Sequence, residues 1–268
     1  MKFPFVTTAH WVFTTKYGLK YITDWGQQTV AVSEDIKKYL MDNYKIPEDH
    51  IIVTINGIDT DKFSPDTDCS KVKAEFGLLD KDNTIVYVSR LDESRSLVAK
   101  QLLETVKTLN KNIDNLKVVV VGDGDDFDNV RKMADGINAE LGDNVIQLAG
   151  ARTNINEFVG VAKLFVGVSR AALEAMAAEK PVVIAGNEGY IGLFDESKLD
   201  VGIKTNFCCR GCVASSSELL EKDILAFFAL PEEKQSELGR YGREIIKKHY
   251  SVFKMADDNI AIYNRVLR

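Results

Sequence analysis

Short runs of apolar residues alternate with longer amphipathic segments through most of the chain. The runs are rich in valine and isoleucine and are hydrophobic at successive positions, which is typical of parallel strands covered on both faces. We predict strands at five of them: Ile85–Ser89, Lys117–Val121, Val145–Ala149, Leu164–Val168 and Pro181–Ala185.

The segments between these runs have helical periodicity. Leu102, Val106 and Leu109 share one helix face, and apolar residues recur in the same way over residues 127–141. The small residues at 171–178 predict a further helix. This alternation predicts an α/β fold with a doubly wound parallel sheet over residues 51–248. Ligands of such sheets bind at the carboxyl ends of the strands.

The two ends of the chain depart from this pattern. Residues 3–9 and Val30–Val32 predict strands, and Ser33 is placed to cap a helix that reaches Tyr44. Two strands and two helices bury too little for an independent core, so we expect residues 1–50 to be the remnant of another domain. Ser251 is expected to cap a last helix, which makes residues 249–268 a separate segment.

Composition excludes several classes of protein. The chain has 34 basic and 40 acidic residues and a net charge of −6, without a block of lysine and arginine, which argues against a dedicated nucleic-acid binder. No apolar run approaches the roughly 20 residues that span a bilayer, and the first residues lack the features of a signal peptide. Four cysteines make no disulfide scaffold, so we expect a reduced, cytoplasmic protein.

The stretch VVVVGDGDDFDNV imitates a dinucleotide-binding fingerprint, because a strand is followed by Gly122, Gly124 and a helix. The third glycine position holds Phe127, and the four aspartates of the turn would repel a pyrophosphate. We interpret the segment as a tight connection between strand and helix.

Two other segments carry candidate phosphate ligands. Arg90 and Arg95, in SRLDESRS, follow a predicted core strand, and their guanidinium groups match phosphate oxygens in geometry. The alternative is a solvated loop in which both arginines pair with Asp92 and Glu93. The amides of residues 169–172, at the start of the small-residue helix, could bind an anion.

Glu174 lies one turn into that helix and could accept both hydroxyls of a ribose, or it could merely complement the helix dipole. The cluster Cys208-Cys209-Arg210-Gly211-Cys212 fits zinc poorly, because adjacent cysteines rarely face one metal and a fourth ligand would be as distant as Cys69. We therefore expect reduced thiols and no metal, and a redox role stays open.

Taken in order, VAVSEDIKKYL, VTINGIDTDKFSPD, IVYVSRLDESRS, VVVVGDGD and LAGARTNINEFVGVAKLFVGVSRAALEAMAAEKPVV resemble the family-four retaining glycosyltransferases of GT-B fold. The resemblance covers nearly the whole chain. It implies that Arg90 and Arg95 hold the donor diphosphate and that Glu174 binds the donor ribose. It places residues 150–154, with Arg152 and Asn154, near the donor base.

The resemblance also implies roles for both ends of the chain. The helix over residues 251–267 matches one that crosses back onto the N-terminal domain, and His10 matches a histidine near the reacting sugar. Most of the acceptor-binding N-terminal domain has no counterpart here, so we expect a missing N-terminal half, whether the chain is a truncated piece, a split gene product or a natural half-enzyme.

The loop before the small-residue helix departs from the family as well. Ser169 and Arg170 run straight into the helix, so the first glutamate of the family motif is absent, and Arg170 is expected to extend the phosphate site. Ser89 stands where a glycine is usual. Glu188, in NEGYIGLFDESKLD, could supply the lost sugar contact; the alternative is a turn-rich connector.

The implied reaction transfers a hexose from a UDP- or GDP-sugar with retention and needs no metal. The implied acceptor is a glycan or a lipid-linked molecule of envelope polysaccharide or glycolipid synthesis, with peripheral contact to the inner face of the membrane. The alternative is a non-catalytic half that binds a nucleotide sugar. An epimerase of related architecture fits the motifs less well.

Overall fold

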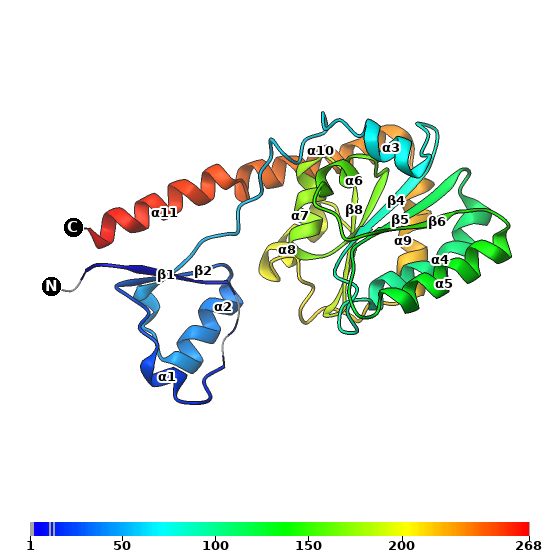
Figure 1. The fold of residues 1–268 in the computed structure, drawn as a ribbon. Coiled ribbons are helices and arrows are strands. Elements are labelled where there is room, and N and C mark those ends of the chain that lie inside the picture. The colour runs from blue at the N-terminus through cyan, green and yellow to red at the C-terminus, as the bar shows by residue number, and fades with distance from the viewer. Residues whose placement is uncertain (1–2, 11, 13, 268) are drawn as a thin grey trace. The chain divides into compact units, whose positions relative to one another are not determined.

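The computed structural model describes residues 3–10, 12 and 14–267. The chain divides into two compact units, coloured along the chain in Figure 1. The first unit combines residues 1–57 with residues 248–268, and the second comprises residues 58–247. The last segment of the chain therefore belongs to the same unit as the first fifty residues.

The first unit is built on a parallel sheet of three strands in the order β1-β2-β3. The expected strands are β1 (Val6–Ala9) and β2 (Gln28–Ala31). The third strand, β3 (Ile51–Val53), pairs with β2, with Ile51 opposite Thr29. The boundary predicted at residue 51 was therefore too early, because these three residues complete the first sheet and do not open the second.

Short helices surround this sheet. They are α1 (Leu19–Ile22), α2 (Glu34–Tyr39), a π-helical turn at Leu40–Tyr44 and a 3-10 turn at Glu48–His50. The helix begins after Ser33 as predicted, but the Ser33 hydroxyl bonds to the Asp35 carboxylate and makes no cap to the helix amides. A small buried core forms from residues of all three strands, α2 and the π-helical turn, including Ala9, Ala31, Ile36, Leu40 and Ile51.

The second unit has a six-stranded sheet in the order β6-β5-β4-β7-β8-β9. The five predicted strands are confirmed as β4 (Asn83–Val88), β5 (Leu116–Val121), β6 (Ile146–Gly150), β7 (Leu164–Gly167) and β8 (Val182–Gly186), and all five are parallel. β9 (Gly189–Leu193) pairs antiparallel with β8. The interpretation of this stretch as a connector was wrong, because the chain turns back at residues 187–188 and adds an edge strand.

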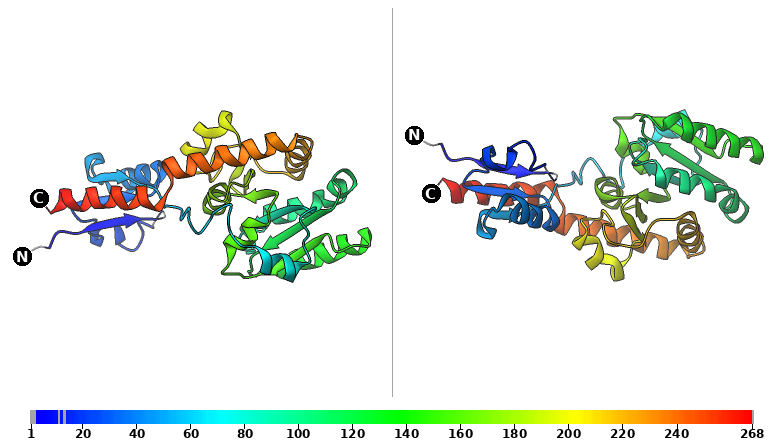
Figure 2. Two further views of the ribbon diagram at one scale, coloured as in Figure 1. Left: turned by 90° about the horizontal axis from the view of Figure 1, so that it is seen from above. Right: turned by 90° about the horizontal axis from the view of Figure 1, so that it is seen from below.

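Helices cover both faces of the second sheet, as a doubly wound fold requires. Figures 1 and 2 show α4, α5 and α9 on one face and α6, α7 and α10 on the other. The helices of the second unit are α3 (Ser70–Phe76), α4 (Leu97–Asn112), α5 (Phe127–Leu141), α6 (Ile155–Gly160), α7 (Ser169–Ala177), α8 (Leu199–Lys204, after a 3-10 turn at Glu196–Lys198), α9 (Ser217–Phe228) and α10 (Glu232–His249), whose last two residues belong to the first unit.

The last helix, α11 (Val252–Val266), belongs to the first unit and is capped as predicted, since the Ser251 hydroxyl accepts from the Lys254 amide. The predicted faces of α4 and α5 are confirmed, because Leu102, Val106 and Val130 are fully buried against the sheet. No helix within the described ranges is long and apolar enough to cross a membrane.

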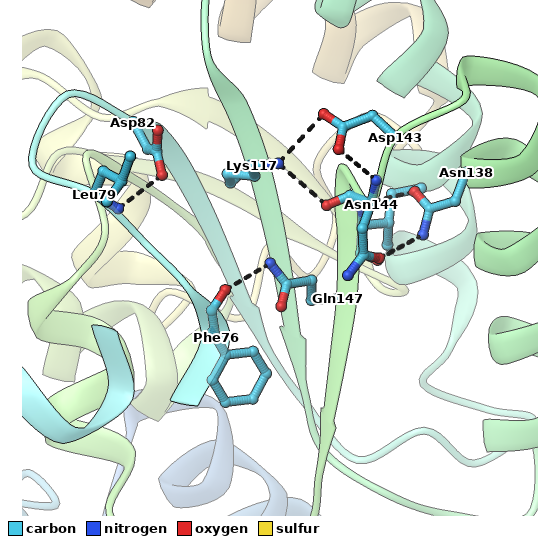
Figure 3. A network of polar contacts seen from close by, with 9 residues as sticks. Phe76, Leu79, Asp82, Lys117, Asn138, Asp143, Asn144 and Gln147 are labelled. Atoms are coloured by element: carbon cyan, nitrogen blue, oxygen red, sulfur yellow. Dashed lines mark hydrogen bonds and ion pairs between the residues drawn. The ribbon is translucent and has the colours of Figure 1, made fainter. Parts of the chain in front are cut away.

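The outer strand β6 is protected at its free edge by side chains (Figure 3). The Asn138 amide bonds both backbone groups of Ile146, donating to its carbonyl at 2.8 Å and accepting from its amide at 2.9 Å. Gln147 donates to the Phe76 carbonyl at 3.1 Å. Because these groups occupy hydrogen-bonding positions along β6, this edge is poorly suited to pair with another strand.

The strand order creates a switch point in the middle of the sheet. From β4 the chain moves outward to β5 and β6, then returns to the other side of β4 to form β7 and β8. The loops that leave the carboxyl ends of β4 and β7 therefore diverge, and such a divergence is where open α/β sheets bind ligands.

Candidate functional site

The loop between β4 and α4 carries Arg90 and Arg95 and is held at several points. The Leu91 amide donates to the Asp123 carbonyl at 3.0 Å, and the Leu91 carbonyl accepts from the Asp126 amide at 2.9 Å. Beneath the loop, the buried Tyr87 hydroxyl donates to the Arg95 carbonyl at 3.4 Å. The backbone that carries both arginines is thus fixed to the β5–α5 turn.

Gly122 makes this contact between the two loops possible. Its φ angle is +140°, and a Cβ atom at this position would lie 1.7 Å from the Ser89 carbonyl oxygen. The interpretation of the GDGD stretch as a tight connection is confirmed, because its glycine lets the β5–α5 turn touch the β4–α4 loop.

Asp126 joins the same two loops through its side chain. The residue is only 2% exposed and accepts hydrogen bonds from the Ser96 hydroxyl and, at 2.7 Å, from Asn129. The Lys100 ammonium lies 2.5 Å from its carboxylate. These bonds, that of Lys100 first, lower the Asp126 pKa to about 2. The sequence showed only one aspartate of four in an acidic turn, because Ser96 and Lys100 lie about 30 positions away, at the start of α4.

The two candidate arginines differ in their surroundings. Arg90 is exposed, whereas Arg95 is half-buried and pairs with the Asp92 carboxylate at 3.1 Å. The pKa of Asp92 is lowered, mainly by a hydrogen bond from Ser94 and also by both arginine charges. The paired-loop alternative is thus correct for Arg95, and the Arg90 guanidinium faces solvent.

The start of α7 lies at the other side of the switch point. Ser169 adopts a left-handed conformation with φ +55°, and its amide donates to the Phe207 carbonyl at 2.8 Å. The expectation of a free anion-binding amide at Ser169 is therefore wrong for this conformation. The carbonyl that accepts this bond comes from a loop far along the chain, and no local sequence pattern predicts that contact.

Glu174 lies one turn further along α7 and its side chain is only 12% exposed. Arg170, itself exposed, donates from Nε to Glu174 Oε1 at 2.8 Å. Burial raises the Glu174 pKa, while the charges of Arg170 and Lys62 act in the opposite direction. Lys62 was not predicted, and its basic character within GIDTDKF was the only signal that could have indicated it.

Glu188 lies in the turn between β8 and β9. This turn follows the carboxyl end of β8, which runs parallel to β7. Its carboxylate forms a two-point ion pair with Arg210, with atoms 3.1 Å apart at the shortest. The predicted sugar contact by Glu188 is not tested by this arrangement, which places the side chain against the cysteine-containing loop.

Arg152 and Asn154 follow β6. The Arg152 guanidinium donates to the Ala149 carbonyl at 2.8 Å, pairs with Glu75 and lies 5.5 Å from the ring centres of both Phe76 and Phe158. This side chain ties α3 to α6. Asn154 precedes the first turn of α6, where its carbonyl accepts from the Glu157 amide.

His10 belongs to the first unit, directly after β1. Its Nδ1 atom lies 3.2 Å from Asn56 Oδ1. Both residues line a cavity of about 420 Å³ at the carboxyl ends of the three strands, whose other wall is α11. Thr54 also lines this cavity, is 4% exposed, and has no hydrogen-bond partner for its hydroxyl in the part of the chain that the structure describes.

The cysteines do not form a metal site. Within the described residues, no group of three or more metal-ligating side chains comes together. Cys69, the distant candidate ligand, is buried in the second unit beside Gly160, where a Cβ on that glycine would lie 2.2 Å from its sulfur. The residues present therefore do not fit a bound zinc ion.

Comparison with known proteins gives two family matches. The family described as "Glycosyl transferases group 1" matches residues 70–245, and "Glycosyltransferase Family 4" matches residues 1–62. The protein EpsD of Bacillus subtilis (strain 168), named "Putative glycosyltransferase EpsD", is 25% identical over 142 residues, which are 50% of this chain and 36% of EpsD. The chain thus spans little more than a third of that relative.

Solved structures share the fold. A glycosyltransferase from Rickettsia africae superposes with a TM-score of 0.75 at 22% identity, over 98% of this chain and 70% of its own. Anabaena Alr3699/HepE, solved in complex with UDP-glucose, gives a TM-score of 0.65 at 16% identity, over 90% and 64%. These likenesses confirm the predicted α/β fold of GT-B type, and the match over most of the chain shows that it belongs to the group 1 glycosyltransferase family.

Proposed function

We propose that this chain carries the nucleotide-sugar-binding part of a retaining hexosyltransferase. The observation that carries the proposal is that basic residues follow both strands of the switch point of the second sheet. Arg90 and Arg95 follow β4, and Arg170 follows β7 at the start of α7. Burial raises the pKa of Glu174, one turn further along α7, and the charge of Lys62 acts in the opposite direction. The HepE structures, solved with UDP and UDP-glucose, support a nucleotide-sugar donor.

In this proposal the guanidinium groups of Arg90 and Arg95 hold the donor diphosphate. Arginine matches phosphate oxygens with two parallel hydrogen bonds. The Arg95–Asp92 pair opens or shares its donors when the diphosphate enters, because a part-exposed pair is held only weakly. Positive charge at this point stabilises the charge that grows on the departing β-phosphate, and we propose that this suffices without a metal ion.

Glu174 is proposed to bind the ribose. Arg170 engages Oε1 of its carboxylate, and the other oxygen can accept from a ribose hydroxyl. Arg152 and Asn154 are proposed to lie near the donor base. Because Arg152 contacts Glu75 and two phenylalanine rings, its main effect is to position the loop after β6. Glu188 is proposed to reach the donor sugar, which requires it to exchange Arg210 for a sugar hydroxyl.

His10 is proposed to steady the reacting sugar from the first unit. We propose an acceptor that is a glycan or lipid-linked molecule of envelope polysaccharide or glycolipid synthesis, reached at the inner face of the membrane.

Calorimetry with UDP, GDP and their sugars tests the donor site. We expect Arg90→Ala and Arg95→Ala each to weaken nucleotide binding by tenfold or more, because each removes a charge-assisted bond worth roughly 1.5–3 kcal/mol. Arg240→Ala is the matched control, since Arg240 is exposed on α10. Unaltered affinity in both variants, or no binding of any nucleotide by the wild type, would reject the site.

A transfer assay separates the enzyme from its alternative. Turnover that falls in His10→Ala, with nucleotide affinity unchanged, supports the proposed reaction. Nucleotide binding without hydrolysis or transfer, even with candidate acceptors present, would reject catalysis by this chain and identify it as a binding half.

A further inference from the structure

The loop between α8 and α9 contains three of the four cysteines and an unusual backbone. Asn206, Phe207 and Cys209 all have left-handed φ angles, of 50°, 55° and 62°. Side chains other than glycine rarely adopt this region, and such residues persist only where their surroundings hold them. The loop, defined here as residues 205–213 and called the cysteine loop, is therefore a strained segment held by specific contacts.

Cys209 and Cys212 are the first and last residues of a tight turn within this loop. The Cys212 amide donates to the Cys209 carbonyl at 3.0 Å, and Gly211 supplies the φ of +80° that the turn requires. A turn closed by this bond brings the two Cα atoms within about 7 Å, a span that a disulfide can bridge. All four cysteines are thiols in the structure.

The two thiols differ in access. Cys209 is fully buried, with its sulfur 3.9 Å from the Ile184 carbonyl oxygen, whereas Cys212 is partly exposed. Burial, and then the neighbouring Cys212 and Cys208, raise the pKa of Cys209 to about 12. Of these two thiols, an oxidant from solvent therefore reacts first with Cys212. Cys209 is then the thiol that attacks the mixed disulfide formed on Cys212.

The cysteine loop also touches the candidate site. Phe207, two residues before Cys209, accepts the Ser169 amide at the start of α7. Arg210, between the cysteines, pairs with Glu188. Gly189 lies so close to the Cys209 carbonyl that a Cβ on it would be 2.4 Å from that oxygen. A change in the turn at residues 209–212 therefore acts on Ser169 and Glu188, two residues that are predicted to contact the sugar nucleotide.

We propose that Cys209 and Cys212 are a reversible redox pair whose disulfide withdraws the Phe207 carbonyl from the Ser169 amide. The sulfur of Cys209 must leave the Ile184 carbonyl to reach Cys212. Because the backbone at Phe207 and Cys209 is already strained, we place this movement at Phe207. The freed Ser169 amide, at the N-terminal end of α7, can then donate a hydrogen bond to an anion.

The chemistry balances with a low-molecular-weight disulfide as the oxidant. The Cys212 thiolate attacks one sulfur of that disulfide, forming a mixed disulfide and releasing one thiolate. Cys209 loses its proton to solvent and attacks the Cys212 sulfur, releasing the second thiolate. Two protein thiols lose two electrons and two protons in total, and the oxidant is reduced to two thiols. The high pKa of Cys209 makes the second step slow.

The experiment incubates the whole chain in glutathione buffers of increasing oxidised fraction. Peptide mapping is expected to show a Cys209–Cys212 disulfide that dithiothreitol reverses. Cys208→Ser is the control and should form it as the wild type does, while Cys212→Ser should not. Hydrogen exchange at the Ser169 amide is expected to accelerate at least tenfold on oxidation in the wild type and in Cys208→Ser, and to stay unchanged in Cys212→Ser.

Binding of UDP gives a further readout, and this effect rests on the proposed function. Oxidation is expected to tighten UDP binding by about tenfold, the effect of one added bond to a charged phosphate. If UDP binds neither form, the proposed function fails while mapping and exchange still decide the redox pair. A disulfide that involves Cys208, the absence of any disulfide, or an oxidised form with unchanged exchange at Ser169 would overturn the proposal.

Discussion

Asp126 should contribute a measurable part of the stability of the second unit, and its contribution should depend on pH. The carboxylate is 3% exposed and holds Ser96 and Lys100 of α4 as well as Asn129 of α5. Its pKa falls from an ordinary value of 3.8 to about 2. That difference corresponds to about 2 kcal/mol, and solvent screening at the part-exposed Lys100 reduces it to about 1–2 kcal/mol.

The sign follows from linkage. Because the folded pKa lies below the unfolded one, the stabilisation is complete above about pH 4 and is lost as the pH falls through about 2. Asp126→Asn keeps the shape but turns an acceptor into a donor that faces Lys100. We expect the variant to be about 2 kcal/mol less stable at pH 7, with the difference from wild type shrinking as the pH approaches 3.

Hydrogen exchange of the β4 and β5 amides is the appropriate assay, because the two units can unfold separately and a global signal would mix them. Asp128→Asn is the control, since Asp128 lies in the same helix, is 78% exposed and pairs only with Arg131 at 3.3 Å among the pairs seen in the structure. It should change stability by less than about 0.5 kcal/mol. An Asp126→Asn variant as stable as the wild type at pH 7, or a difference that does not shrink in acid, would refute the reasoning.

Three further substitutions test other contacts. Gly122→Ala should lower the melting temperature strongly through its clash with the Ser89 carbonyl, whereas Gly136→Ala, in open space within α5, should raise stability by about 0.5–1 kcal/mol. Thr54→Val should leave the first unit equally or more stable in urea titrations followed by tryptophan fluorescence, while Thr29→Val, which loses a bond to the Trp25 carbonyl, should weaken it by about 1 kcal/mol. Arg152→Met should destabilise the second unit by about 1 kcal/mol in thermal melts, because it removes the pair with the part-exposed Glu75 and the bond to the Ala149 carbonyl, yet weaken UDP binding less than Arg90→Ala does.

The central strands were predictable because their signal is local. A parallel strand covered on both faces is apolar at successive positions, as β7 is throughout and as β4 and β5 are over residues 85–88 and 118–121. β3 has only three residues, and β9 contains two glycines, so neither pattern stands out. The partners of the site residues were not predictable, because Arg152 and Glu75 are separated by 77 positions and no local pattern records such a contact.

The two sides of the switch point are held very differently, and this difference bears on how the site can work. The β4–α4 loop is fixed by the Tyr87 hydroxyl, by two backbone bonds of Leu91 and by the Asp126 carboxylate. At the start of α7, one backbone bond to another element is seen among the described residues, from the Ser169 amide to Phe207, whose own backbone is strained. A modification that shifts one loop can therefore change the α7 side while the Arg90 and Arg95 side keeps its geometry. The cysteine loop contacts the side with fewer restraints, which is where a small chemical change can have the larger structural effect.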